Sequence, residues 1–336
     1  MKKFVGFCVL LMMVAGVAHS TEPTPLWSLT EEDASIFTQQ DWHYTEGWRI
    51  ARLADPITDS FWAQLLEGFG SVPKTLGAGS TVAEHYQWPI IGHSIFNPQN
   101  KNISVPDPRD RPYAGWLYLG AGLALTAASG RTDRVELLLG VVGPTALGRE
   151  VQNGFHALAG FGKSRGWDFQ LYDEPALLAQ YQTIWDRSLH RFGYIETDAL
   201  PEVGVTVGNV LTYGEAGGWL RLGHGLAAGG TPQTNTPGLS GTGGLDRTKL
   251  EGIFGWMLFG GMQTRAVWRN LFLEGNSYHD SPGVEKRNFV TDEMVGLGLL
   301  FRFGLRIDIS YIKRGREFSG QVNDDRFGSI TLSSRF

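Results

Sequence analysis

Gln152 and His156 are the residues of this sequence whose types and spacing most directly suggest chemistry. They lie in the segment 147–160, where apolar residues such as Val151 and Phe155 recur at helical spacing. Residues at positions i and i+4 of a helix share one face. If this helix packs on a wall, the imidazole can take a proton from water as a general base. Spacing alone favours the alternative, a histidine that only packs and hydrogen-bonds.

A run of acidic residues, Glu31, Glu32 and Asp33, is the second candidate, with Thr45 at the start of the next predicted strand. Hard oxygen ligands of this kind suit Ca²⁺, which takes roughly 6–8 oxygens. A cation there would polarise an ester carbonyl, so a histidine base and a bound metal together would hydrolyse an ester. A solvated acidic turn is the alternative. The sequence contains no His-Glu-x-x-His zinc helix.

Alternation of apolar and polar residues predicts the elements that position these groups. In the segment 295–311 the odd positions are apolar or aromatic, while most even positions are polar or glycine, with Gly304 at a predicted bend or turn. A membrane strand turns successive side chains to lipid and lumen and needs about 9–11 residues. The pattern predicts an all-β fold, a transmembrane antiparallel β-barrel. A soluble β-sandwich is the less favoured alternative.

About twelve strands are predicted, since such barrels usually have an even number. The segments are 25–34, 42–54, 83–95, 112–127, 132–143, 188–198, 201–213, 216–227, 251–262, 264–276, 292–304 and 305–315, with 327–336 closing.

Two connections depart from the alternation. The segments 147–160 and Glu174–Trp185 have helical spacing, which predicts short helices in an extracellular excursion near 147–186. The segment 229–246 is rich in Gly, Thr, Pro and Ser, which predicts a mobile surface loop without packing of its own.

The first residues indicate export. Met1-Lys2-Lys3 and an apolar run up to Ala18 predict a signal peptide at 1–20, leaving 21–336 as the barrel. The apolar run is too short to span a bilayer as a helix, and no later segment is comparable, which excludes a helical membrane protein. The only cysteine, Cys8, lies in the signal, and Phe336 resembles the terminal assembly signal of outer-membrane barrels. A net charge of −5 with 45 glycines is not the profile of a nucleic-acid binder.

Several ordered blocks resemble a known family, the outer-membrane lipid A 3′-O-deacylases of the LpxR type. The blocks are 31–37 (EEDASIF), 41–47 (DWHYTEG), 110–118 (DRPYAGWLY), 142–144 (VGP), 151–156 (VQNGFH) and 166–167 (GW), so the resemblance covers essentially the whole mature chain. It implies a twelve-stranded barrel whose site lies between the wall and a helix of an extracellular excursion. It also implies removal of the 3′-linked acyloxyacyl chain of lipid A with Ca²⁺.

By this resemblance His156 is the water-activating base, Gln152 is its neighbour, and Thr45 matches a site threonine. The metal ligands would be Glu31, Glu32 and Asp33. Two positions depart from the family, since Glu31 replaces an asparagine and Gly162 stands where the family has a site glutamate.

A basic pair of the family that meets lipid A phosphates corresponds to Lys101-Asn102, so one charge remains, which Arg109 and Lys163 would supplement. Solvated rim charges are the alternative for all three. The Asp-Arg-Pro-Tyr block is taken as structural, with interfacial aromatic anchors. The expected partners are lipopolysaccharide in the outer leaflet of a Gram-negative outer membrane and the barrel assembly machinery.

The function predicted from the sequence is therefore Ca²⁺-dependent lipid A 3′-O-deacylation. One alternative is a catalytically altered family barrel that binds lipopolysaccharide or acts as a pore, for which Glu31 and Gly162 are the reason. The other is an outer-membrane phospholipase, because ester hydrolysis does not itself select the headgroup.

Overall fold

The computed structural model describes residues 25–38, 42–54, 64, 68, 81–231, 234, 235 and 244–335. The predicted signal peptide at 1–20 and the terminal Phe336 lie outside the described residues and stay predictions.

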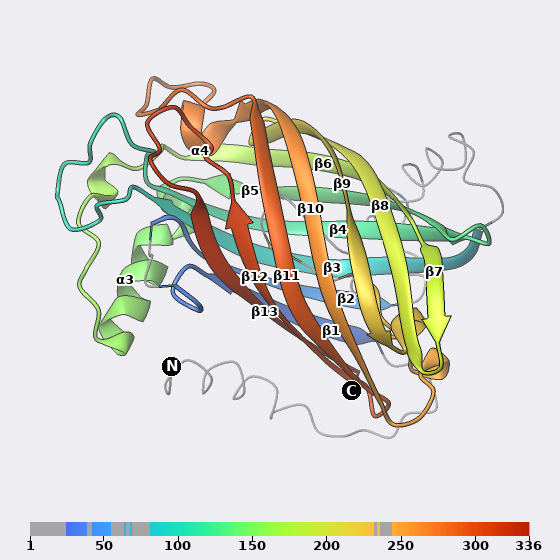
Figure 1. Ribbon diagram of the computed structural model, residues 1–336. Coiled ribbons are helices and arrows are strands. Elements are labelled where there is room, and N and C mark those ends of the chain that lie inside the picture. The colour runs from blue at the N-terminus through green and yellow to red at the C-terminus, as the bar shows by residue number, and fades with distance from the viewer. Residues whose placement is uncertain are drawn as a thin grey trace.

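Antiparallel strands form one closed sheet (Figure 1). The strands are β1 (Leu26–Asp33), β2 (His43–Ala54), β3 (Thr81–Asn97), β4 (Ala114–Ala127), β5 (Arg131–Val142), β6 (Glu174–Trp185), β7 (Arg187–Phe192), β8 (Ile195–Gly208), β9 (Leu211–His224), β10 (Phe254–Asn270), β11 (Phe289–Phe301), β12 (Leu305–Arg314) and β13 (Asp325–Arg335). β1 pairs with β13, and β6 pairs with β8. The short β7 continues β6 in the same register along β8, so twelve strands close the ring. The predicted β-barrel is confirmed.

The predicted alternation is confirmed on β11 and β12. Val295 and Ile309 are exposed on the outside, whereas Arg306 and Asp308 are buried in the lumen. Gly304, with a φ of 107°, lies in the turn between these strands, a backbone conformation that favours glycine.

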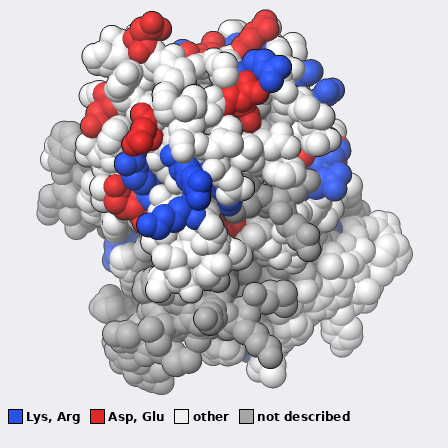
Figure 2. All heavy atoms as spheres, turned by 90° about the vertical axis from the view of Figure 1, so that its left-hand side faces the viewer, with Lys and Arg blue, Asp and Glu red and all other residues white. Residues whose placement is uncertain are grey.

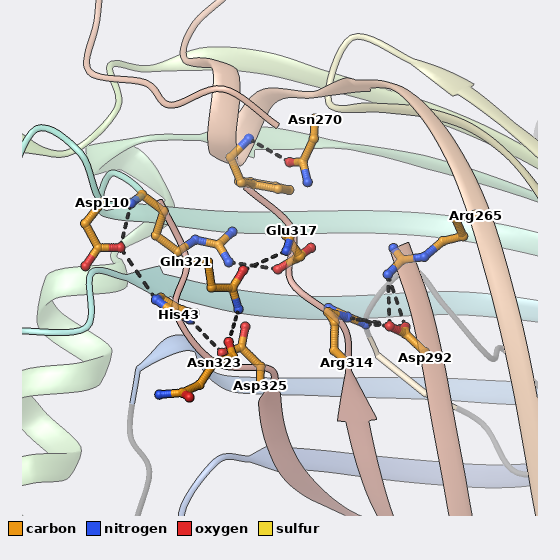
Figure 3. Close-up of polar contacts among 12 residues, drawn as sticks. His43, Asp110, Arg265, Asn270, Asp292, Arg314, Glu317, Gln321, Asn323 and Asp325 are labelled. Carbon is orange, nitrogen blue, oxygen red and sulfur yellow. Dashed lines mark hydrogen bonds and ion pairs between the residues drawn. The ribbon is translucent and has the colours of Figure 1, made fainter. Parts of the chain in front are cut away.

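Ion pairs join neighbouring strands on the lumenal side (Figure 3). Asp292 lies between Arg265 and Arg314, with oxygen to nitrogen distances of 3.1 and 2.8 Å. His43 contacts Asp325 at 2.6 Å and Asp110 at 3.5 Å, so it links two strand starts to a connecting loop. Buried charges must be paired in this way to offset their desolvation.

One predicted helix is confirmed and the other is wrong. After η1 (Pro144–Ala146), the helix α3 (Gly148–Ala159) begins at the predicted place, and η2 (Trp167–Phe169) follows. Residues Glu174–Trp185 form the strand β6 instead of a helix. Their lumenal face includes Leu178 and Ile184, so apolar residues on both faces hide the period of two. No helix among the described residues is both long and apolar enough to cross a bilayer.

Two predicted strand breaks are shifted or wrong. The break predicted near 263 lies inside β10, where Gly261 makes room for the Trp219 ring rather than forming a turn. A Cβ atom at Gly261 would lie only 2.7 Å from that ring. The predicted strand 188–198 instead spans β7, the following turn and the start of β8, and the predicted strand 201–213 runs from β8 into β9.

The prediction of an unpacked surface loop at 229–246 is also wrong for the residues that the structure describes. Thr231, Thr234 and Asn235 are buried inside the barrel. The Asn235 side chain donates to the carbonyl of His93 at 3.0 Å and accepts from the Tyr118 hydroxyl at 2.5 Å. Small polar residues pack here because the lumen offers polar partners. The flanking turns are η3 (Leu226–Ala228) and η4 (Arg247–Lys249), and α4 (Leu271–Glu274) follows β10.

Candidate functional site

The helix α3 lies at one end of the barrel, outside the ring of strands (Figure 1), and we call this end the α3 end. His93 Nε2 donates to the carbonyl of Ala146 at 2.7 Å. A Cβ atom at Gly148 would lie 2.6 Å from the Trp167 ring and 3.1 Å from the Gly115 Cα on β4, so glycine allows the helix to approach both closely. Val151 packs on a buried apolar cluster that includes Trp167. The helix is therefore held against the outer wall, as its amphipathic pattern predicts.

A chain of hydrogen bonds fastens α3 to the strands. Gln152 accepts from the Trp167 indole at 2.9 Å and donates to Asn97 Oδ1 at 3.2 Å. Thr45 donates its hydroxyl to the same Asn97 oxygen. Asn97 and Gln152 are fully buried. The structure thus brings Thr45 and Gln152 together through Asn97, which the sequence analysis missed because no pattern marks the last residue of a strand.

His156 lies one turn beyond Gln152. Its Nδ1 donates to the carbonyl of Gly162 at 2.7 Å, and because a carbonyl only accepts, this bond puts the proton on Nδ1. Phe161 contacts the ring edge-on, with centroids 5.8 Å apart. Burial, and then the cation of Lys101, lower the pKa of His156 below its ordinary value of 6.5. A neutral imidazole with a basic Nε2 is the form that a general base requires.

Strand alternation separates the predicted metal ligands on β1. Glu32 is fully buried in the lumen, where its carboxylate accepts from the Tyr44 hydroxyl at 2.9 Å and from the backbone N–H of Asn235 at 2.8 Å. Glu31 lies on the opposite, outer face. The run is therefore not one cluster, since Glu32 is engaged inside the barrel.

Glu46 is a carboxylate that the sequence analysis missed. A bulge between Tyr44 and Glu46 shifts the register of β2 against β3, and Glu46 lies opposite Asp33. The charge of Glu46 acts on both Glu31 and Asp33. Asp33 also accepts from the backbone N–H of Ser35 at 2.5 Å. Within the described ranges, no group of three or more His, Cys, Asp or Glu side chains converges closely enough to define a metal site.

The comparison with protein families decides the family. A family model described as "Outer membrane protein LpxR" matches residues 4–336. The chain belongs to the LpxR family. It is an outer-membrane β-barrel.

The solved structure of one family member agrees with this fold. LpxR from Salmonella typhimurium has a TM-score of 0.73 at 19% sequence identity, and the match covers 93% of this chain and 100% of that one. The β domain of the Bordetella autotransporter BrkA has a TM-score of 0.43 at 10% identity, covering 93% of this chain and 99% of that one. No curated protein matches the chain by sequence.

The three basic residues that the sequence predicts to meet lipid A phosphates differ in their surroundings in this LpxR-family chain. Lys101 is half-buried, its charge acts on Asp33 and His156, and burial lowers its pKa to about 8. Arg109 is exposed and pairs with Asp107 at 2.8 Å. Lys163 is exposed next to Gly162. The α3 end, which faces the viewer in Figure 2, shows acidic beside basic side chains rather than a purely basic surface.

Proposed function

We propose that this LpxR-family barrel is a lipid A 3′-O-deacylase that hydrolyses the ester of the 3′-acyloxyacyl chain. The observation that carries the proposal is the location of His156, on a helix held against the outer wall, where the charge of Lys101 acts both on His156 and on the outer-face carboxylate of Asp33. A base on the lipid side of the wall meets membrane lipids, whereas a base in the lumen would meet solutes. With the α3 end on the extracellular side, the lipid is lipopolysaccharide.

In the proposed reaction, Nε2 of His156 takes a proton from water as the water oxygen attacks the ester carbonyl. The bond to the sugar 3′ oxygen then breaks, and that oxygen recovers the proton. The Gly162 carbonyl holds Nδ1–H, and because it is a backbone group, it orients the ring without the glutamate that the family has at this position.

Gln152 and Thr45 serve as positioning residues in this proposal. The amide oxygen and nitrogen of Gln152 are both engaged, with Trp167 and Asn97. The two residues hold α3 at a fixed distance from β2 and β3, and with it His156.

Glu31, Asp33 and Glu46 are the carboxylates that the predicted Ca²⁺ would draw together, since they do not converge on one point in this structure. These carboxylates repel one another, as the mutual action of their charges indicates, and a cation relieves such repulsion. Bound Ca²⁺ would polarise the ester carbonyl and stabilise the oxyanion. Glu32, already engaged with Tyr44 and Asn235, is replaced by Glu46 in this ligand set.

Lys101 is the basic residue proposed to meet a lipid A phosphate, because it alone of the three acts on both His156 and Asp33. Insertion by the barrel assembly machinery after removal of the segment 1–20 is part of the same proposal.

The test is mass spectrometry of lipid A from cells that express the chain or His156→Ala. The proposal expects loss of the 3′ acyloxyacyl mass with the unmodified chain only. His279→Ala, at an exposed position, is the matched control and retains activity. Full deacylation by His156→Ala contradicts the assigned base.

The altered barrel remains the second candidate, because Glu31 adds a charge and Gly162 removes one relative to the family. Unchanged lipid A in every sample, with lipopolysaccharide still bound, supports it. Thin-layer chromatography of the phospholipids in the same cells separates a phospholipase from both.

A further inference from the structure

Two carboxylates in the lumen differ from their neighbours. Glu202 on β8 and Glu215 on β9 are only 2% and 5% exposed, and neither forms a salt bridge within the described part of the chain, although the charge of Arg134 acts on both and that of Arg265 acts on Glu215. Arg134 pairs with Glu136, and Arg265 with Asp292. Because each of these arginines is in direct contact with another carboxylate, the charges of Glu202 and Glu215 are only partly compensated, and burial makes this costly unless a proton or a bound cation completes the compensation.

The pairing of β8 with β9 brings the two carboxylates together. Glu202 lies opposite Gly217, and Glu215 lies opposite Gly204, so acids and glycines occupy alternate corners of one lumenal square. A Cβ atom at Gly204 would lie 2.4 Å from Glu215 Oε1. Gly204 therefore leaves room for the Glu215 carboxylate, and the charges of Glu202 and Glu215 repel each other.

Two glutamine side chains and one indole surround the Glu202 carboxylate. Gln182 and Gln263 donate to Glu202 at 3.3 and 3.2 Å, and the Trp219 indole donates to it at 3.3 Å. The amide oxygens of both glutamines, and Oε2 of Glu215, are buried and accept no hydrogen bond among the described residues. The glutamines are 1% and 0% exposed. Because an amide can rotate to exchange its oxygen and nitrogen, each glutamine can present an oxygen to the same space.

We propose that the lumen contains a cation site formed by Glu202, Glu215, Gln182 and Gln263. Two carboxylates balance a divalent charge, and carboxylate and amide oxygens are the ligands that Ca²⁺ prefers. The site joins β6, β8, β9 and β10, and it is separate from the outer-face carboxylates. It is independent of the proposed deacylase activity.

Terbium luminescence tests this site, because Tb³⁺ replaces Ca²⁺ and is sensitised by a nearby indole such as Trp219. The experiment uses the full barrel in detergent with Glu31→Gln and Glu46→Gln, so that the outer face does not contribute. Excitation of tryptophan is expected to give Tb³⁺ emission that Ca²⁺ displaces, and Ca²⁺ is expected to raise the Tm.

Two variants distinguish loss of the sensitising indole from loss of the cation site. Trp219→Phe should lose the Tb³⁺ emission but keep the rise of Tm with Ca²⁺. The double variant Glu202→Gln/Glu215→Gln should lose both the emission and the rise of Tm. Asp308→Asn, which removes a carboxylate already paired with Arg306 at 2.7 Å, should keep both. If the double variant does not fold, Gln263→Leu is expected to weaken Tb³⁺ binding. Absent emission in the background protein, or unchanged emission in the double variant, overturns the proposal.

Discussion

The two faces of β1 carry neighbouring glutamates in opposite situations. Glu32 faces the lumen, where Tyr44 and Asn235 satisfy its carboxylate. Glu31 faces outward, where Glu46 and Asp33 add like charges. In the lumen most charged side chains are paired, as Asp292 is with two arginines, whereas the outer face brings carboxylates of like charge together. Charged side chains that have a partner stabilise a fold, whereas like charges held close together are a feature of sites where a ligand acts.

The largest expected effect concerns the outer face. His156→Ala removes the proposed base, and loss of general-base catalysis typically lowers a rate by about 10²–10⁴-fold. We expect this loss in kcat for purified lipid A with Ca²⁺, and an unchanged Tm, because His156 lies on a helix outside the barrel ring. A parallel fall of Tm and activity would instead assign His156 to packing.

The lumenal counterpart is Asp292→Ala, which leaves Arg265 and Arg314 without their shared partner. Removing one member of a buried ion pair costs about 3–5 kcal/mol of unfolding free energy. Denaturant unfolding in micelles measures this loss. Asp107→Ala, which breaks the exposed pair with Arg109, is the control and should leave the midpoint unchanged. Equal effects of both substitutions would remove the distinction between the two environments.

Glu31→Gln and Glu32→Gln test the comparison on adjacent residues. Glu32→Gln loses one of two buried acceptors and should cost about 1–3 kcal/mol of stability, with an unchanged Ca²⁺ midpoint for activity. Glu31→Gln should leave the Tm unchanged and move the Ca²⁺ midpoint to higher concentration. The reverse pattern would return Glu32 to the ligand set.

The smallest expected effect is a displaced pH profile. Activity requires neutral His156, so it is lost as the pH falls through the pKa of His156, which burial and Lys101 hold below 6.5. Lys101→Met removes the cation, raises that pKa, and moves the acidic limb of kcat/KM to higher pH. Lys101→Arg keeps the charge and should keep the limb in place. If the acidic limb of the kcat/KM profile stays at the same pH in Lys101→Met, Lys101 does not act on the base.

Local patterns in the sequence determined the barrel and its attached helix. Period-two alternation predicted the lipid and lumen faces of β11 and β12, and helical spacing predicted α3 with Gln152 and His156 on it. The same reasoning failed at Glu174–Trp185, because a strand with apolar residues on both faces has no clear period.

Only the tertiary structure decided which polar groups meet. Asn97, Glu46 and Asn235 carry no local signal, because each acquires its role from strand register, a bulge or a loop that enters the lumen. The acidic run looks like one cluster in the sequence, yet the pleat of β1 sends Glu31 and Glu32 to opposite sides of the wall. Sequence sets the order of side chains along a strand, whereas register and closure determine their neighbours across it.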